Sequence, residues 1–239
     1  MVFQNEDIGG IVLPICYNHL VQGVIYNCIS EDLSKFLHDK GFIFGNRKFK
    51  LFTFSRLQGR YTLDKKNGKI IYVSDVNLLL SSPINRFIKE ITNTLVRRGF
   101  IMLGENKLRV TEMAFPGMPN ISKETRIYTL SPITVYSTLL TPEGRKKTYY
   151  YSPYERDFSK LINSNAKKKH FLIRGKSLKS ELFIEPLRVK EVVVKYKGTI
   201  IKGWIGNFKL KGPKSLIETV YEAGLGSKNS QGFGMFEVI

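Results

Sequence analysis

The sequence has little cysteine and no long hydrophobic run. Its two cysteines, Cys16 and Cys28, have the spacing of neither a disulfide framework nor a metal site, so we interpret both as small buried side chains in a reducing compartment. No stretch approaches the roughly 18 apolar residues that span a bilayer, and the first residues lack the basic and apolar regions of a secretion signal. These absences predict a cytoplasmic protein without a membrane-spanning helix or a cysteine-bound metal.

Acidic residues are also scarce relative to basic ones. The 239 residues include 38 Lys and Arg but only 20 Asp and Glu, which gives a formal net charge of +18 and a pI of about 9.8. Such an excess repels itself unless a polyanion neutralises it, so nucleic acid is the first expected partner. The excess is concentrated in residues 121–239, which carry 22 basic and 10 acidic residues, against 16 and 10 in residues 1–120.

The secondary-structure signals divide into two similar series. A run rich in proline and glycine, residues 115–120, falls near the midpoint and indicates a linker, so we expect one unit at 1–118 and another at 119–239. The expected elements of the first unit are a helix capped by Asn18, a short helix over 31–40, a strand over 49–54, a hairpin turning at Asn67-Gly68, a helix capped by Ser82 and stopped by Gly99, and a strand over 107–115.

The second unit repeats this order without repeating the sequence. We expect a strand over 127–130, a helix opened by the capping box of residues 152–155, two strands that turn at Lys197-Gly198, a helix over 213–223 and a strand over 235–238. The second of the two strands places Phe208 and Leu210 on one face and Lys209 and Lys211 on the other. The whole pattern predicts an α+β protein of two tandem ferredoxin-like (RRM-like, βαββαβ) units, each an antiparallel four-stranded sheet backed by two helices.

A glycine-rich loop at residues 224–234, GLGSKNSQGFG, is the most distinctive local motif. Four glycines, a lysine and small polar side chains allow backbone N–H groups to approach an anion closely. The loop follows a helix and opens a strand, so it is neither a P-loop nor a dinucleotide fingerprint, and nucleotide hydrolysis is disfavoured. Taken alone, the loop is equally well explained as a helix C-cap followed by a tight turn.

This loop resembles the signature loop of the CRISPR-associated endoribonucleases that cut precursor CRISPR RNA within its repeats, the Cas six family. The stretches 17–27, YNHLVQGVIYN, and 50–55, KLFTFS, are also similar to that family. The resemblance implies two ferredoxin-like domains with a basic cleft between them and cleavage without a metal or cofactor. It also implies CRISPR repeat RNA as substrate and delivery of the product to an effector complex.

The same resemblance places the catalytic residues at Tyr26, His38 and Lys50. Cleavage of RNA without a metal requires deprotonation of the 2′-OH, protonation of the leaving 5′ oxygen and a cation on the phosphorane. Lys50 suits the last task and His38 suits proton transfer, as acid or base. Tyr26 lies opposite the apolar stripe of its helix, so its hydroxyl should be reachable, and we expect it to orient the 2′-OH, or to act as a base if its pKa is lowered.

Two other histidines are alternatives that the sequence leaves open. His19 lies seven residues before Tyr26, on the same side of the helix, and could replace or assist His38, although a capping role is also open to it. His170 follows three lysines near the end of a helix and is interpreted as a C-terminal cation or a phosphate contact.

The expected RNA contacts lie in the second unit, where basic and loop residues would neutralise or approach phosphates. They are Lys167, Lys168, Lys169, Lys209, Lys211, Gly224, Gly226, Lys228, Asn229, Ser230, Gly232 and Gly234.

Two further functions compete with the nuclease. The chain could be a non-catalytic subunit that holds CRISPR RNA, or a general chaperone of single-stranded RNA. Both need the basic surface but no reacting groups. The sequence also leaves open whether the protein is a monomer or a homodimer.

Overall fold

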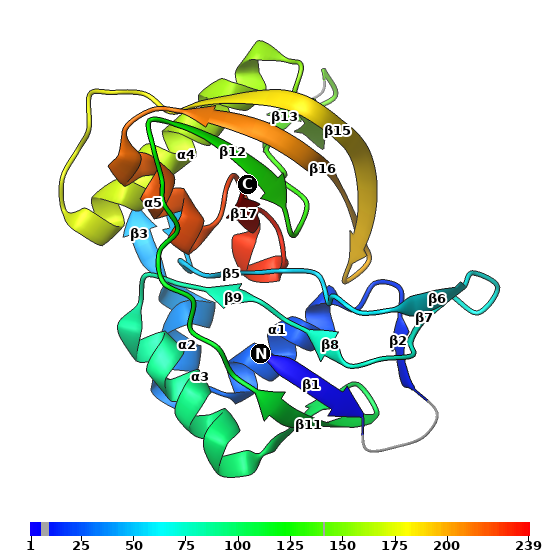
Figure 1. Ribbon diagram of the computed structural model, residues 1–239. Helices are drawn as coiled ribbons and strands as arrows, with labels where there is room; N and C mark the ends of the chain where they lie inside the picture. Colours follow the sequence, from blue (N-terminus) through cyan, green and yellow to red (C-terminus); the bar gives the residue numbers. More distant parts are fainter. Residues whose placement is uncertain (6–9, 141) are drawn as a thin grey trace.

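The computed structural model describes residues 1–5, 10–140 and 142–239. The chain forms two units, one above the other in Figure 1: an N-terminal unit that ends with β11 (Asn106–Glu112) and a C-terminal unit that begins with β12 (Glu124–Thr129). The segment between these strands runs along one side of the molecule from one unit to the other (Figure 1). Within the described ranges, no helix has both the length and the apolar character to cross a membrane.

The C-terminal unit is a four-stranded antiparallel sheet with two helices. After β12 come α4 (Arg156–Arg174), β15 (Phe183–Tyr196), β16 (Thr199–Lys211), α5 (Lys214–Ala223) and β17 (Phe236–Val238). The strand order across the sheet is β15-β16-β12-β17, so the first strand lies between the third and the fourth. This is the ferredoxin-like arrangement, and it confirms the predicted fold class.

β15 and β16 form a long curved hairpin that reaches down to the N-terminal unit (Figure 1). Lys197 and Gly198 form its two-residue turn, and both have positive φ, 45° and 82°, as a type I′ turn requires. On β16, Phe208 and Leu210 are buried in the core as predicted, while the alternate lysines lie on the other face of the sheet.

The N-terminal unit has the same plan with insertions. Its elements before β11 are β1 (Val2–Asn5), β2 (Ile11–Pro14), α1 (Asn18–Asn27), α2 (Glu31–Lys35), the π-helical turn η1 (Phe36–Lys40), β3 (Phe42–Phe44), β4 (Arg47–Phe49), β5 (Thr53–Phe54), β6 (Tyr61–Asp64), β7 (Lys69–Tyr72), β8 (Val76–Asn77), β9 (Leu80–Ser81), α3 (Asn85–Arg98) and β10 (Phe100–Leu103).

The sheet of this unit has the order β10-β11-β1-β8. β9 continues the line of β8 and pairs with β5, and a bridge between Gln58 and Asn77 joins the two lines. Without β10, the order is β11-β1-β8/β9-β5. This is the order of a ferredoxin-like sheet in which the second and third strands along the chain are interrupted. The small sheet β2-β7-β6 and the hairpin β3-β4 are additions to this plan.

Each unit buries its own hydrophobic core. Phe52 stacks on Phe87 at 4.8 Å between ring centroids in the N-terminal unit, and Phe158 meets Trp204 edge-on at 5.9 Å in the C-terminal unit. A smaller buried cluster, Phe49, Leu51 and Ala223, contains residues of both units. Because apolar burial is the main stabilising term, this cluster favours close contact between the units beside β4.

Several local predictions need correction. Asn18 does not cap α1, because its side chain is buried and donates to Gln231 O and Gly232 O instead. The Asn67-Gly68 turn has four residues, Lys65 to Gly68, and only Gly68 has positive φ. Sequence analysis also missed β10 and the hairpin of β13 (Tyr136–Leu140) and β14 (Lys146–Tyr150).

Candidate functional site

A polar cavity of about 300 Å³ lies between the two units. We call it the basic cleft, because its described lining includes cationic side chains from both units and no carboxylate. Its lining residues are Arg47, Lys48, Phe49, Lys50, Leu51, Phe52, Tyr136, Asn165, Lys169, Gly226, Ser227, Lys228, Asn229 and Ser230. A cavity with this charge is suited to an anionic ligand.

One cation that lines the basic cleft, Lys50, is in direct contact with a phenol, Tyr26, which lies outside the described lining. Lys50 Nζ donates a hydrogen bond to the Tyr26 hydroxyl at 3.2 Å and lies 5.5 Å from the centre of its ring. Tyr26 is half-buried on α1, where its ring packs edge-on against Phe52 at 6.0 Å. The fold therefore brings together two of the three predicted catalytic residues, which are 24 positions apart in the chain.

Burial changes the proton affinities of both groups. It raises the pKa of the Tyr26 phenol well above its ordinary value, and the neighbouring Tyr196 adds to the rise. Burial lowers the pKa of Lys50, although the Asp39 carboxylate opposes that change. Tyr26 is therefore a neutral hydroxyl near neutral pH, which fits a group that orients the 2′-OH and does not fit a phenolate base.

An irregular backbone segment presents Lys50. The strand predicted over 49–54 is broken, because the chain leaves β4 at Phe49 and enters β5 only at Thr53. Between them Leu51 has a φ of 52°, a conformation unusual for a branched residue, and its carbonyl accepts a hydrogen bond from Ser82 Oγ at 2.8 Å. The break turns a predicted strand residue, Lys50, into a cleft residue.

His38 lies near this pair but does not contact it. It is on η1, which ends at Gly41 with a φ of 63°, and its side chain is 76% exposed. Its Nδ1 is 2.7 Å from Asp39 Oδ1, and this interaction lowers the pKa of Asp39. Asp39 also raises the pKa of Lys50 electrostatically, but no hydrogen bond or ion pair among the described residues joins His38 or Asp39 to Lys50 or Tyr26.

The other two histidines are engaged in the fold. His19 Nδ1 is 3.0 Å from Cys16 O just before α1, and α1 has no side-chain cap hydrogen bond, so His19 does not take the capping role that the sequence left open. His170 is buried and its Nδ1 is 3.0 Å from Thr219 Oγ1. The interpretation of His170 as a helix-terminal cation is therefore wrong, since α4 continues to Arg174 and burial lowers the pKa of His170.

The glycine-rich loop packs inward between the units. Gln22 of α1 donates to Ser230 O at 2.5 Å, and Thr53 of β5 donates to Phe233 O at 3.0 Å. Its four glycines are buried and have positive φ, and a Cβ at Gly234 would lie 2.0 Å from Leu225 O. These glycines therefore allow the tight packing of the loop, whereas Ser230, Asn229 and Lys228 line the basic cleft.

The predicted RNA-binding lysines separate into three groups. Lys228 lines the basic cleft and lies 4.9 Å from the centre of the Tyr136 ring. Lys168 lies beside Arg47, whose charge adds to burial in lowering the pKa of Lys168. Outside the described lining of the cleft are Lys209 and Lys211, which both pair with Glu124, and Lys167, which donates to Lys179 O.

Lys169 requires a correction. Its side chain is only 1% exposed, and its ammonium donates to two loop carbonyls and to the Asn229 side chain. It cannot meet a phosphate in this conformation, so the predicted RNA contact at Lys169 is wrong. The run of three lysines gave no signal of this, because α4 turns each of them in a different direction.

Sequence reasoning missed several cleft residues. Arg47 and Lys48 come from β4, and Tyr136 and Asn165 come from the C-terminal unit. The basic residues just before Lys50 in the sequence could have indicated Arg47 and Lys48. Nothing in the sequence distinguished Tyr136 or Asn165, because neither belongs to a motif.

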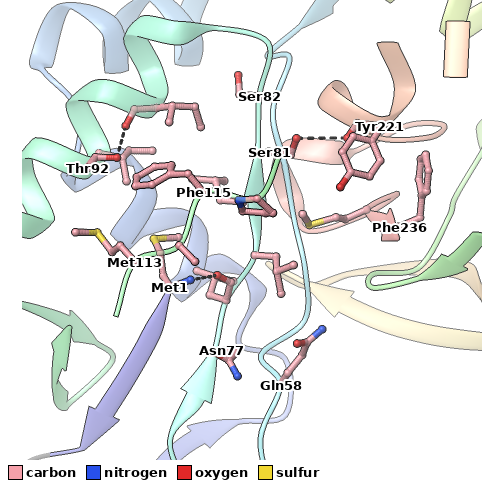
Figure 2. Close-up of a pocket in the computed structure, with 18 residues that line it drawn as sticks. Met1, Gln58, Asn77, Ser81, Ser82, Thr92, Met113, Phe115, Tyr221 and Phe236 are labelled. Atoms are coloured by element: carbon pink, nitrogen blue, oxygen red, sulfur yellow. Dashed lines mark hydrogen bonds between the residues drawn. The ribbon is translucent and has the colours of Figure 1, made fainter. Parts of the chain in front are cut away.

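A second cavity, of about 460 Å³, also lies between the units (Figure 2). We call it the apolar cavity, because aliphatic, aromatic and methionine side chains form most of its wall and its described lining contains no Lys, Arg, His, Asp or Glu side chain. Figure 2 shows Met113 and Phe115 on one side and Tyr221 and Phe236 on the other. The Met1 N-terminal ammonium, which donates to Leu78 O at 3.3 Å, is the charged group in this described lining.

The fold and the basic cleft define a class of protein: two ferredoxin-like units with a cationic site between them. Family comparison identifies the family within that class. The N-terminal model of CRISPR-associated protein Cas6 matches residues 12–114, and the C-terminal model of CRISPR associated protein Cas6 matches residues 116–238. The chain belongs to the Cas6 family.

Individual relatives agree with this assignment. The CRISPR-associated endoribonuclease Cas6 1 of Methanocaldococcus jannaschii is 30% identical over 228 residues, covering 94% of this chain and 86% of the relative. The CRISPR-associated endoribonuclease Cas6 of Pyrococcus furiosus is 28% identical over 240 residues, covering 95% and 83%. A solved structure described as CRISPR associated protein Cas6 superposes with a TM-score of 0.81 at 28% identity, covering 100% of this chain and 97% of that one.

Proposed function

We propose that this protein is a metal-independent endoribonuclease that cuts precursor CRISPR RNA within its repeats. The names of its relatives support an endoribonuclease, and the observation that carries the proposed chemistry is the contact of Lys50, which lines the basic cleft, with Tyr26. The N-terminal unit, residues 1–118, would supply the reacting groups, and the C-terminal unit, residues 119–239, would supply the loop that borders them.

The proposed reaction is an internal transesterification. The 2′ oxygen attacks the adjacent phosphorus while the bond from phosphorus to the 5′ oxygen breaks. The 2′-OH loses its proton and the leaving 5′ oxygen gains one, so the products are a 2′,3′-cyclic phosphate and a 5′-OH. The cyclic phosphate can then hydrolyse to a 3′-phosphate.

Each of the three residues has one task. The Lys50 ammonium stabilises the charge that develops on the phosphorane. The Tyr26 hydroxyl, kept neutral by burial, orients the 2′-OH. His38 exchanges a proton with the 2′ or 5′ oxygen, and Asp39, bound to its Nδ1, leaves Nε2 available for that exchange.

Two experiments test this function. Incubation of the protein with its cognate repeat RNA in excess EDTA should give one cut, and a requirement for Mg²⁺ would rule out the mechanism. A repeat with a 2′-deoxy sugar at the cut position should bind with the affinity of the unmodified repeat and remain intact.

One observation favours a second candidate, a non-catalytic subunit that holds CRISPR RNA. His38 is exposed and, among the described residues, hydrogen-bonds to neither Lys50 nor Tyr26. This candidate predicts that the unmodified repeat also stays intact, so the pair of RNAs separates the two. Transfer of the bound RNA to an effector complex is compatible with both.

A further inference from the structure

A buried cation lies beneath the glycine-rich loop. Lys169 Nζ is 2.6 Å from Gly224 O, 3.1 Å from Gly226 O and 2.6 Å from Asn229 Oδ1. These three acceptors match the three N–H groups of a charged ammonium, whereas a neutral amine has only two. No carboxylate in the described part of the chain forms an ion pair with Lys169, which makes the burial of this charge costly.

The pKa of Lys169 reflects the cost of burying its charged form. Burial lowers this pKa to about 7, so the ammonium loses its proton more readily than that of an exposed lysine. A buried methionine would fill similar space without this penalty. The charge must therefore be explained by what its hydrogen bonds hold in place.

The hydrogen bonds that begin at Lys169 extend through the glycine-rich loop and on to helix α1. Asn229, fixed by Lys169, donates to Leu225 O at 2.8 Å and to Phe233 O at 3.0 Å, which closes the loop on itself. Asn229 begins the short 3₁₀ turn η2 (Asn229–Gln231), and the last two carbonyls of this turn accept hydrogen bonds from α1.

The α1 side of this network leads to Tyr26. Gln22 donates to Ser230 O of the turn and accepts a hydrogen bond from the Tyr196 hydroxyl at the tip of the β15–β16 hairpin. Tyr196 is close enough to raise the pKa of Tyr26. On the other side, Lys228 directly precedes the turn with a φ of 60° and lines the basic cleft.

We propose that Lys169 is a positioning residue for RNA cleavage: its buried ammonium holds the glycine-rich loop in the conformation that places Lys228 at the basic cleft and braces α1, which carries Tyr26. This inference rests on the proposed function. It assigns no contact between Lys169 and RNA. It requires that loss of the ammonium both loosens the loop and slows cleavage.

The test compares Lys169→Met with a matched control on the same helix. Methionine keeps the length of the side chain but leaves three buried acceptors without donors. The control is Lys160→Met, because Lys160 is exposed and contacts only Asp157 among the residues described. Two quantities are measured: the single-turnover rate of repeat cleavage at saturating RNA, and the hydrogen-exchange protection of amides 224–234 in the free protein.

We expect Lys169→Met to lower the rate at least tenfold and to reduce loop protection at least tenfold, with Lys160→Met unchanged in both. A wild-type rate in Lys169→Met overturns the proposal, and so does a slower rate with unchanged loop protection. If Lys169→Met does not melt cooperatively, Asn229→Ala takes its place, because it removes one Lys169 acceptor and the two bonds that close the loop. Unchanged loop protection in Asn229→Ala also overturns the proposal.

The result also separates this inference from the proposed function. A wild-type protein that cuts no repeat RNA, with loop protection lost in Lys169→Met, refutes the nuclease alone. A wild-type protein that cuts, with Lys169→Met cutting equally well, refutes the role of Lys169 alone.

Discussion

The basic cleft and the apolar cavity lie between the same two units but differ in what lines them. The described lining of the cleft has five cationic residues and no carboxylate, and that of the cavity has no charged side chain. The cleft includes a left-handed residue, Leu51, and a buried unpaired cation, Lys169, which both cost stability. The cleft therefore contains a strained backbone position and a buried charge, whereas the described lining of the apolar cavity is mostly apolar.

The largest expected effect comes from the proton-transfer group at the cleft. His38→Ala should lower the single-turnover cleavage rate by about 10² to 10⁴, the usual worth of general acid–base catalysis. His19→Ala is the matched control and should stay within about threefold of wild type, because the His19 ring is bound to the backbone at Cys16 O. A loss below about tenfold for His38→Ala, with a larger loss for His19→Ala, would transfer the role to His19.

Loss of the phosphorane cation should have a similar but smaller effect. We expect Lys50→Met to lower the single-turnover rate by about 10² to 10³, since one preorganised charge contact is removed from the transition state. Lys48→Met, two positions earlier on β4, removes the same charge from the cleft and should weaken RNA binding more than it slows cleavage. Equal rate losses in the two variants would show that Lys50 contributes only to the overall positive charge of the cleft and makes no specific contact with the phosphorane.

The apolar cavity should respond in stability and not in cleavage. Ile91 is buried on α3 and lines this cavity, so Ile91→Ala should lower the free energy of unfolding by about 2 to 5 kcal/mol. The cleavage rate, measured well below the melting temperature, should remain that of wild type. A tenfold slower rate in a folded Ile91→Ala protein would break the proposed division between the two cavities.

The stability of the protein should also depend on pH through Lys169, a residue of the basic cleft. The folded pKa of Lys169 is about 7 against an ordinary 10.5, so the unfolded chain binds more protons between these values. The unfolding free energy of wild type relative to Lys169→Met should therefore rise with pH from about 7 to 10.5, by at most about 1.4 kcal/mol per pH unit. Denaturant titrations at pH 7, 8 and 9 measure it, and a difference that falls with pH contradicts the lowered pKa of Lys169.

The smallest effect concerns the salt dependence of RNA binding. Lys228→Met removes one cleft cation, so the slope of log affinity against log salt concentration should become shallower by about 1. Phe115→Ala, in the apolar cavity, should leave the slope unchanged. Filter binding of the 2′-deoxy repeat between about 50 and 200 mM salt measures both. An equal change in both variants would mean that RNA also covers the apolar cavity.

Most of the fold could be predicted from local signals. Alternating residues gave the buried face of β16, and Gly99 and Gly41 gave the ends of α3 and η1. The failures occurred where distant contacts override local preference. The strand over 49–54 is broken because Leu51 is held by Ser82, and Asn18 binds the glycine-rich loop instead of capping its helix.

The candidate site was less predictable than the fold. Tyr26, His38 and Lys50 were located by resemblance, and only the structure shows that Tyr26 and Lys50 touch while His38 is exposed and bound to Asp39. Their separation along the chain carries no information about distance, because the contact depends on how α1 and the segment after β4 pack together.

The sequence by itself determined the two ferredoxin-like units, their order and the excess of positive charge, because periodicity, glycine positions and composition are local properties. The tertiary structure alone decided which lysine lies near the cleft and which is buried against the loop. Lys168 and Lys169 are neighbours of the same chemical type, yet one lies beside Arg47 near the cleft and the other is buried beneath the loop. The environment of a charge, and hence its pKa and its use, is set by residues far away in the chain.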